Sequence, residues 1–564
     1  MSASDAARRA GAAPDGDGTR NADGAHRADS ARDPDLPLMP AILAAARERP
    51  ADPLLLTPQR SYGHGELCGC AARIAAALRE AGVAPRRRVA IYADSYDGFF
   101  AAMLGIWLCG GVAVPINTSL PAAEARRLIE RAAPDAMVHD AALAGPAADA
   151  VGASCAPAAV LPLDDLLATA PPPTPDPREV DLPHAGDPAM ILFTSGTTGV
   201  PKGVCQTMAA VGGNAARVAA ELALTPADRI FINTPPYFTS GICHFLTLAA
   251  AGGSTYAEAG FFFGEGLLDR LQERGCTGFG GAPAHLVRVV EPLSTPRRIP
   301  DLRFWVSSGD HLPEHTIRRT REMLPGVALF NMYGLTEVSG RLCILPPGQI
   351  DRRPGSVGRP IAGMRVTARD ETGDTLPPGR TGEFYVDGPL LMSGYLDDPQ
   401  ASAAALTPHG FRTGDFGHTD ADGYVWVAGR RDDIFKRGGE KVSTVQIQQA
   451  LLALPGVADC AVVAAADEVL GHVPVAFVVT GDEQAGLARR LLKELRAELP
   501  ASSLPSRIVA VAAIPRTGSG KAVRKELLRL LGAGDSSDAN DRSRRDGDGG
   551  DRAGGRSHID TGSG

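Results

Sequence analysis

The spacing of apolar residues changes repeatedly between helical and strand-like patterns over residues 40–165. Residues 71–82 carry apolar side chains at helical spacing and end in glycine, as helices often do. Residues 88–92 form a short apolar run that predicts a strand, and residues 122–133 have the amphipathic pattern of a helix. Because helices and strands alternate, we expect an α/β sheet region here.

One apolar segment, residues 101–116, is the best candidate for a membrane span. It has only 16 residues and is interrupted by Gly110, Gly111 and Pro115, whereas a spanning helix needs about 20 apolar residues. We therefore interpret it as a buried helix, a glycine stop and a buried strand, and we expect no membrane span.

The alternation resumes after a proline-rich loop at residues 171–177 and continues through residues 207–330, with strands predicted at 229–233, 277–280 and 304–308. From residue 356 to 427 short strand-like segments are separated by glycine-rich turns, which predicts a small β-subdomain. The last alternating region predicts a compact lid, with helices at 445–454 and 487–499 and strands at 461–465 and 473–479.

The two ends of the chain are polar and contain few large apolar residues. Such segments cannot bury enough apolar surface to offset the entropy lost on ordering, so residues 1–35 and 534–564 are expected to be disordered tails. Between them we expect a large N-terminal domain over residues 36–431 and a C-terminal lid domain over residues 432–533.

Composition narrows the class of protein. The 44% hydrophobic and 22% charged residues are ordinary for a water-soluble globular protein, and the net charge of −8 argues against a general nucleic-acid binder. The start of the chain lacks the apolar core of a signal peptide, and the nine cysteines show no metal or disulfide spacing. We therefore expect reduced thiols and a cytoplasmic protein.

Residues 193–203, Phe-Thr-Ser-Gly-Thr-Thr-Gly-Val-Pro-Lys-Gly, follow an apolar strand-like run and contain four hydroxyls, three glycines and one lysine. Glycines let backbone N–H groups approach an anion, hydroxyls donate to phosphate oxygens, and the lysine adds positive charge. We interpret the segment as a polyphosphate site rather than a plain surface turn. Its candidate nucleotide-binding residues are Thr194, Ser195, Gly196, Thr197, Thr198, Gly199 and Lys202, of which Lys202 is also a catalytic candidate.

Four further segments complete a family pattern: Asn-Met-Tyr-Gly-Leu-Thr-Glu at 331–337, Phe-Arg-Thr-Gly-Asp at 411–415, Gly-Arg-Arg-Asp-Asp-Ile-Phe-Lys at 429–436 and Pro-Arg-Thr-Gly-Ser-Gly-Lys at 515–521. On these five segments the chain resembles the adenylate-forming superfamily, which includes acyl-CoA synthetases, adenylation domains and luciferases. The resemblance implies an α/β fold, with a large N-terminal domain of sheet subdomains, a small β-subdomain and a small mobile α+β lid.

The resemblance assigns roles at the phosphates and the adenine. Glu337 would ligate Mg²⁺, which prefers oxygen ligands, and Thr336 would assist at the phosphates. Tyr333 would stack on adenine, Asn331 would bond its amine edge, and Met332 would lie beside them. Taken alone, this segment is also compatible with a helix entry capped by Thr336.

The resemblance also indicates which residues would bind the ribose. Asp415 would accept both ribose hydroxyls, and Arg430 would meet the same sugar, with Gly309 completing the nucleotide site. The family often has tryptophan before the aromatic residue of this motif, where the chain has Gly410.

The C-terminal motifs imply a moving lid. Lys521 would neutralise the charge that gathers on the α-phosphate, whereas Lys525 is interpreted as a solvated lysine. Asp432 aligns with the hinge about which the lid rotates, with Arg431 and Asp433 as alternatives.

The acid and thiol sites are less well defined. Residues 235–241 match a segment that reads Pro-Leu-Phe-His in many acyl-CoA synthetases, and here Thr239 replaces that gate histidine, with His244 as an alternative five residues on. Amino-acid-activating relatives have an aspartate in this segment that binds the substrate ammonium. The segment here has no aspartate, so the resemblance favours an acid without an α-amino group. Residues 261–263 are either acyl pocket or ordinary core. Residues 438–443 resemble the pantetheine tunnel, and the acid and CoA candidates are Phe238, Thr239, Gly281, Lys436 and Gly439.

The resulting hypothesis is an ATP-dependent acid–thiol ligase that uses Mg²⁺ and CoA and activates a fatty, aryl or small carboxylic acid. A second hypothesis keeps adenylation but passes the acyl group to a carrier protein acting in trans, to an amine or to another nucleophile. A third, a non-catalytic nucleotide-binding scaffold, is disfavoured because all the charged residues of the motifs are present together.

Overall fold

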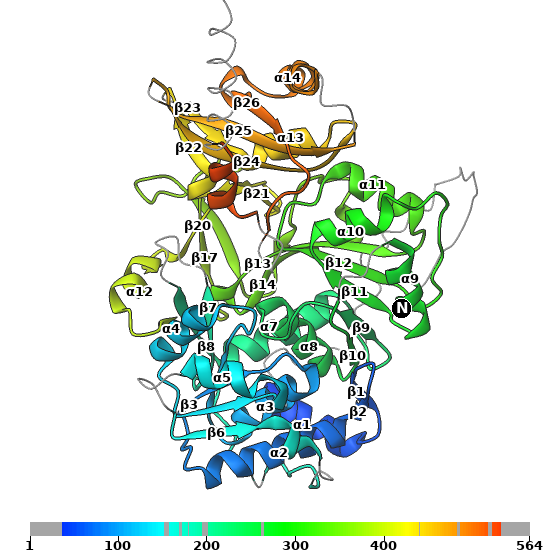
Figure 1. Ribbon diagram of the computed structural model, residues 1–564, viewed down its shortest axis with the longest axis vertical. Coiled ribbons are helices and arrows are strands. Elements are labelled where there is room, and N and C mark those ends of the chain that lie inside the picture. The colour runs from blue at the N-terminus through cyan, green and yellow to red at the C-terminus, as the bar shows by residue number, and fades with distance from the viewer. Residues whose placement is uncertain are drawn as a thin grey trace, which may run out of the picture.

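A computed structural model provides the three-dimensional structure (Figure 1). It describes residues 37–531 except 152–156, 169–171, 179, 195–200, 261–263, 439, 468, 482–485 and 517–521. A large N-terminal part lies below a smaller C-terminal part in all three ribbon views. Over the described residues, none of the helices has the length and apolar character needed to cross a membrane.

A seven-stranded sheet carries the predicted phosphate segment. Its order is β18 (Gly394–Tyr395), β8 (Lys202–Thr207), β7 (Pro188–Thr194), β4 (Val112–Pro115), β3 (Arg88–Tyr92), β5 (Ala136–His139) and β6 (Ala159–Pro162). Strands β7, β4, β3, β5 and β6 are parallel, whereas β8 is antiparallel to both β7 and β18. The phosphate segment therefore leaves the carboxyl end of β7, the edge at which parallel sheets usually bind ligands.

A nine-stranded sheet lies beside it and carries the adenine motif. Its order is β15 (Arg359–Pro360), β14 (Gly340–Leu345), β13 (Ala328–Leu335), β12 (Phe304–Ser308), β11 (Gly278–Gly281), β9 (Arg229–Ile232), β10 (Ser254–Ala257), β1 (Pro53–Leu56) and β2 (Ser61–Gly63). The central strands from β1 to β13 are parallel, and β2, β14 and β15 are antiparallel additions at the edges.

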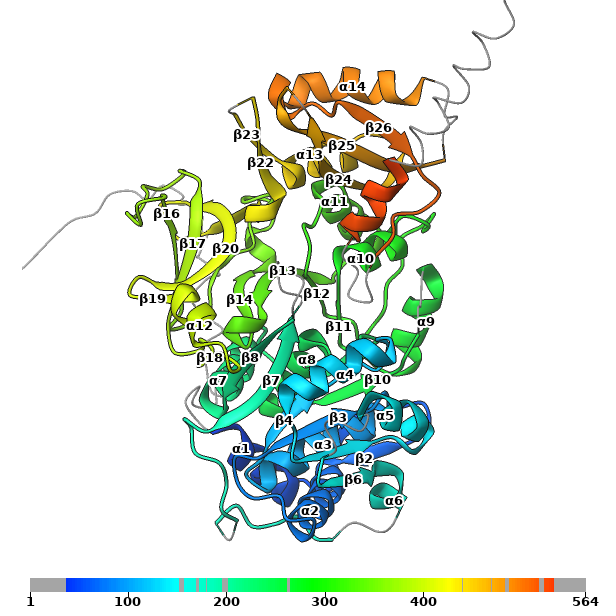
Figure 2. The same cartoon turned by 60° about the vertical axis from the view of Figure 1, so that its left-hand side comes forward.

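Helices fill the space between these two sheets and cover their outer faces (Figure 2). The inner helices share one core with strands of both sheets and are α1 (Leu38–Glu48), α2 (His64–Glu80), α3 (Tyr96–Leu108), α7 (Met208–Glu221) and α8 (Thr239–Ala251). Helix α3 is apolar on every side and almost entirely buried, as expected for a helix inside a core. The outer helices are α4 (Ala122–Ala132) and α5 (Ala144–Val151) on one sheet and α9 (Gly264–Glu273), α10 (Pro283–Val290) and α11 (Glu314–Met323) on the other.

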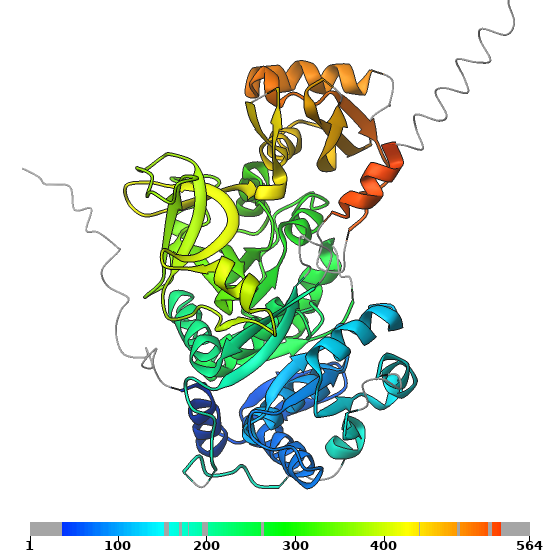
Figure 3. The same ribbon diagram turned by 90° about the vertical axis from the view of Figure 1, so that its left-hand side faces the viewer.

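Two smaller sheets complete the fold (Figure 3). The β-subdomain has the order β16 (Arg365–Arg369), β17 (Gly382–Asp387), β20 (Gly410–Thr419) and β19 (Leu406–Thr407), with β21 (Val425–Arg430) paired to β20. The C-terminal sheet has the order β23 (Glu440–Ser443), β22 (Ile434–Arg437), β25 (Gly471–Thr480) and β24 (Val457–Asp467), with β26 (Arg507–Ala510) paired to β25. Helices α13 (Thr444–Leu452) and α14 (Leu487–Glu498) pack on this sheet.

The predicted fold class is confirmed. The segment 101–116 contains the end of α3, a turn at Gly110 with a φ of 74°, and β4. The predicted β-subdomain and lid are both present, although β24 and β25 form a longer hairpin than their apolar cores indicated. Both predicted tails, residues 1–35 and 534–564, lie outside the described residues.

Candidate active site

The two ends of the predicted phosphate segment are held together by strand pairing. Thr194 ends β7 and lies opposite Lys202, which begins β8. The Thr194 hydroxyl donates to the Lys202 carbonyl at 3.5 Å. The segment is thus the tip of a hairpin, and not the strand-to-helix turn of the common nucleotide loop. The candidates inside the tip, Ser195, Gly196, Thr197, Thr198 and Gly199, lie outside the described residues.

Strand β18 adds a tyrosine to this hairpin. Tyr395 pairs with Val204 of β8, and the Lys202 Nζ lies 4.8 Å from the centre of the Tyr395 ring. The Tyr395 hydroxyl donates to Oε1 of Glu337 at 3.1 Å. Burial, and then the charge of Glu337, raise the pKa of Tyr395, so it stays a protonated donor. The structure therefore brings the predicted Lys202 and Glu337 together through a residue that belongs to none of the sequence motifs.

The predicted phosphate threonine contacts the predicted acid site. Thr336 begins a short 3₁₀ helix, Thr336–Val338, after β13. Its hydroxyl lies 3.2 Å from the hydroxyl of Thr239, the first residue of α8. The Gln206 amide donates to the Thr336 carbonyl and fixes the turn. Phe238 immediately precedes α8, so both acid candidates of this segment lie at the start of that helix.

We expect Glu337→Gln to weaken Mg²⁺-dependent adenylation by about 10- to 100-fold. The amide keeps an oxygen that can accept from Tyr395 but loses the charge that a metal ligand supplies. The measurement is pyrophosphate release as Mg²⁺ is titrated, with Tyr395→Phe as the matched control that removes the same hydrogen bond and keeps the carboxylate. Equal Mg²⁺ dependence in Glu337→Gln and the wild type would contradict the assignment.

The predicted adenine residues Asn331 and Met332 are neighbours on β13, so their side chains lie on opposite faces of the strand. Asn331 is 4% exposed and its amide donates to the Ser356 carbonyl at 2.9 Å, while its Oδ1 is buried without a partner in the described part of the chain. A buried acceptor without a hydrogen bond destabilises the folded protein. The amino group of adenine is a donor that could bond to Oδ1 of Asn331. Met332 points to the opposite face of the strand, where it lines a cavity beneath α8. The structure therefore separates the Met332 side chain from that of Asn331.

The ribose candidates meet at a buried carboxylate. Asp415 of β20 is 3% exposed and lies directly across from Arg430 of β21. The Arg430 Nε is 3.2 Å from Oδ1 of Asp415, and the Tyr333 hydroxyl donates to Oδ2. Burial, followed by the Asp415 charge, raises the pKa of Tyr333 well above its usual value. The structure thus brings Asp415, Arg430 and Tyr333 together. Gly309, the other residue predicted for the nucleotide site, follows β12 and has a φ of 99°.

The predicted hinge joins β21 to β22. Asp432 lies in a 3₁₀ helix, Arg431–Asp433. The Arg430 N–H donates to Oδ2 of Asp433 at 2.8 Å, and Asp433 also forms an ion pair with Arg524. Lys436 lies in β22, while Gly439 and Lys521 lie outside the described residues.

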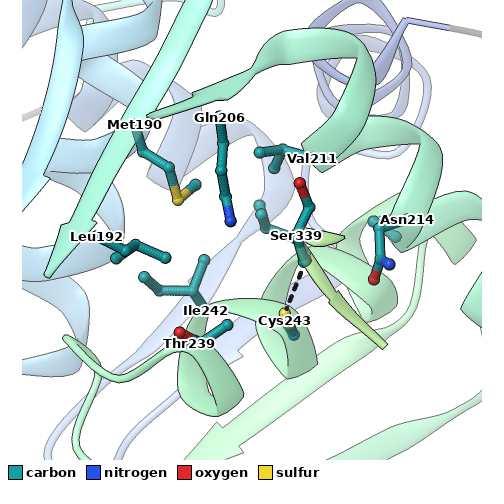
Figure 4. A pocket seen from close by; sticks show the side chains of 11 residues that line it. Met190, Leu192, Gln206, Val211, Asn214, Thr239, Ile242, Cys243 and Ser339 are labelled. Atoms are coloured by element: carbon teal, nitrogen blue, oxygen red, sulfur yellow. Dashed lines mark hydrogen bonds between the residues drawn. The ribbon is translucent and has the colours of Figure 1, made fainter. Parts of the chain in front are cut away.

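Thr239, one of the predicted acid residues, lines a cavity between β7, β8, α7 and α8 (Figure 4). Its wall combines apolar side chains with the polar Thr239, Gln206 and Asn214. The Cys243 thiol donates to the Ser339 carbonyl at 3.4 Å on one side of the cavity. Gly281 ends β11 outside this wall, and residues 261–263 lie outside the described residues.

His244 does not take the place of the gate histidine in this arrangement. It is 8% exposed and faces β11, where a Cβ on Gly280 would lie 2.3 Å from its ring. Burial, and then the charge of Arg341, lower the pKa of His244 to about 3. Thr239, and not His244, contacts Thr336 at the start of α8.

The donor set is compatible with magnesium held together with a nucleotide. Across the described ranges no three His, Cys, Asp or Glu side chains gather as a metal site. Mg²⁺ usually takes one or two carboxylates and completes its shell with water and substrate phosphates. Glu337 beside Lys202 supplies such a carboxylate next to the phosphate hairpin.

Comparison with known proteins agrees with this geometry. Residues 42–396 match the model of the AMP-binding enzyme family, and residues 446–521 match that of the AMP-binding enzyme C-terminal domain. An indoleacetate–CoA ligase of Aromatoleum aromaticum is 31% identical over 84% of this chain and 94% of its own length. A sulfoacetate–CoA ligase of Cupriavidus necator is 30% identical over 86% of this chain and 96% of its own length.

Solved structures show the same arrangement. The crystal structure of an anthranilate CoA ligase in complex with anthranoyl-AMP superposes with a TM-score of 0.79 and 26% identity, covering 89% of this chain and 99% of that protein. The family model alone spans well over half of the 564 residues. This chain therefore belongs to the AMP-binding enzyme family of adenylate-forming proteins.

Proposed function

We propose that this protein is an ATP-dependent acid–CoA ligase of the AMP-forming type. One observation supports this most strongly: the Lys202–Tyr395–Glu337 cluster lies against the phosphate hairpin, and Thr336 next to Glu337 contacts Thr239 at the acid cavity. The proposed phosphate site and the proposed acid site would thus adjoin. The curated relatives described above are CoA ligases by name.

The reaction has two steps. A carboxylate oxygen of the acid attacks the α-phosphorus of ATP, and the bond to the bridging oxygen breaks, so that pyrophosphate leaves and an acyl-adenylate forms. The CoA thiol, after losing its proton, then attacks the acyl carbon and AMP leaves. Lys202 and Lys521 would offset phosphate charge in the first step, Glu337 would hold Mg²⁺, and Asp415 would orient the ribose.

The names of the relatives support the choice of acceptor, and the cysteines support the cellular setting. CoA is the acceptor in the names of both relatives, and we keep it ahead of a carrier protein in trans or an amine. The eight cysteines in the described part of the chain are unpaired, which supports a reducing compartment such as the cytoplasm. The named acids range from an aryl acid to a small acid with two anionic groups, so the family leaves the acid open.

The test is pyrophosphate release from ATP and Mg²⁺ over a panel of aryl, fatty and short acids, followed by addition of CoA and mass analysis. We expect pyrophosphate with at least one acid and the corresponding acyl-CoA after addition. Pyrophosphate without acyl-CoA would favour another acceptor. ATP binding without pyrophosphate from any acid would favour the scaffold hypothesis and contradict the proposal.

We also propose a division into domains at residues 431 and 432, with the lid rotating about Asp432 between the two steps. We expect Asp432→Pro to retain most adenylation and to slow thioester formation by about 10-fold or more, because proline fixes φ near −65° and restricts the hinge to one arrangement. Asp432 lies in the first turn of its 3₁₀ helix, where proline is tolerated. The readout is acyl-adenylate that accumulates without passing to CoA, and equal loss of both steps would contradict this hinge.

A further inference from the structure

Arg341 is a cation buried beneath α8. It is the second residue of β14 and is only 8% exposed. Its Nη2 lies 3.3 Å from Nε2 of His244. Among the described residues, no carboxylate forms an ion pair with Arg341 or raises its pKa; burial lowers that pKa. The guanidinium therefore lacks an anionic partner from the described chain.

The histidine beside it does not neutralise this charge. Since the pKa of His244 is lowered to about 3, the ring is uncharged at neutral pH and accepts a hydrogen bond from Arg341 through Nε2. Removing a cation from water without an anion is costly, and a neutral acceptor offsets only part of that cost. An anion supplied from outside the chain would complete the site.

The side chain of Arg341 borders a small internal cavity. A cavity beneath α8 is lined by Arg341, His244 and Thr247 together with apolar side chains, among them Val306 and Met332. Val306 pairs with Gly280 of β11 on one side and with Phe330 of β13 on the other, and Met332 follows two residues later on β13. The sheet presents no side chain at Gly280, which makes room for the His244 ring.

This cavity lies farther along α8 from the reacting end of the acid site. Thr239, at the start of the helix, contacts Thr336, and His244 follows five residues later, about 7.5 Å along the helix axis. Cys243 lines both this cavity and the one that contains Thr239. Asn214 of the first cavity also donates to the Arg341 carbonyl at 2.7 Å. The two cavities are therefore neighbours along one helix.

We propose that the acid activated by this protein carries a second anionic group, a carboxylate or a sulfonate, which Arg341 binds beneath α8. This inference rests on the proposed function, because it takes the reacting carboxylate to lie near Thr239 and Thr336. The separation along α8 suits a short acid with anionic groups at its two ends. A charged distal group also explains why an arginine is present where the cavity is otherwise mostly apolar.

The test compares acids of equal length with and without the second charge. The doubly charged probes are succinate, glutarate and adipate, paired with butyrate, pentanoate and hexanoate, and 3-sulfopropanoate, which is also paired with butyrate. The measurement is kcat/KM for pyrophosphate release. At least one doubly charged probe is expected to exceed its singly charged partner by about 10²-fold or more. Benzoate and indoleacetate are included as aryl probes.

Arg341→Met tests the residue itself, because methionine has a similar length and no charge. We expect about a 10²-fold loss with the doubly charged acid, unchanged or faster turnover of the singly charged one, and an unchanged or higher Tm, since replacing an unpaired buried charge by an apolar side chain is often neutral or stabilising. The matched control is Arg365→Met, which removes an exposed arginine that pairs with Asp387 in the β-subdomain.

The possible results separate the two proposals. Preference for singly charged or aryl acids in the wild type, or an unchanged preference in Arg341→Met, would overturn the role of Arg341 and leave the ligase function intact. A large drop in Tm with no change in preference would mark Arg341 as a structural residue and would also overturn the inference. No pyrophosphate from any acid would overturn the proposed function, and this inference with it.

Discussion

Lys521→Ala is expected to lower the rate of adenylation by at least about 10²-fold, comparable to losing a preorganised charge-stabilising donor. The residue ends the Pro-Arg-Thr-Gly-Ser-Gly-Lys motif of the lid, and in the proposed reaction it meets the α-phosphate only while the lid is in its first arrangement. Transfer from a supplied acyl-adenylate to CoA should therefore stay close to the wild-type rate. The measurement follows both half-reactions separately, using synthetic acyl-adenylate for the second.

Lys525→Ala is the matched control for this prediction. Lys525 lies four residues along the chain and is exposed in the structure, so its loss should leave both half-reactions unchanged. If Lys521→Ala slowed both half-reactions alike, the two arrangements of the lid would not describe this protein.

Asp415→Ala is expected to reduce kcat/KM for ATP by roughly 10- to 100-fold, because hydrogen bonds to a charged group contribute about 1.5–3 kcal/mol. The buried carboxylate holds both the Tyr333 hydroxyl and the Arg430 guanidinium, and it would also accept the ribose hydroxyls. The side chain of Arg430 is 52% exposed, so it can be solvated when its partner is removed. The loss should therefore fall on nucleotide use rather than on folding.

Tyr333→Phe separates the two functions of that carboxylate. It removes the hydroxyl that donates to Asp415 and keeps both the aromatic ring and the charge. We expect a smaller effect on kcat/KM for ATP than in Asp415→Ala, measured at saturating acid together with the Tm of each variant. An Asp415→Ala protein with wild-type kinetics for ATP would contradict the ribose assignment.

The fold was predictable because its elements are strongly patterned. Strand β3 at Arg88–Tyr92 and helix α4 at Ala122–Ala132 carry unbroken apolar runs or a clear amphipathic face, and both occur almost where the pattern places them. The short strand β18 could not be predicted, because two residues carry no periodicity. Its position depends on pairing with β8, almost 200 residues earlier in the chain.

The site was predictable only where a local motif carried it. Glu337 and Asp415 follow from their neighbours in sequence, whereas Tyr395 is brought to Glu337 by the pairing of β18 with β8. Arg341 opens an apolar run and resembles any residue at the edge of a strand, and its burial arises because α8 packs over it. His244 gave a partial signal, as a histidine near the acid motif, but its burial depends on the glycine at 280 on another strand.

The contacts from Asp415 through Arg430 and Asp433 to Arg524 form a continuous chain from the nucleotide site into the lid. If lid rotation changes the Arg430–Asp433 bond, the free energy of nucleotide binding must differ between the two lid orientations. Thermodynamic linkage is reciprocal, so the bound nucleotide then shifts the equilibrium between lid orientations by the same factor. Conversion of ATP to AMP would thereby provide the signal, as well as the chemistry, that decides which half-reaction the enzyme is ready to perform.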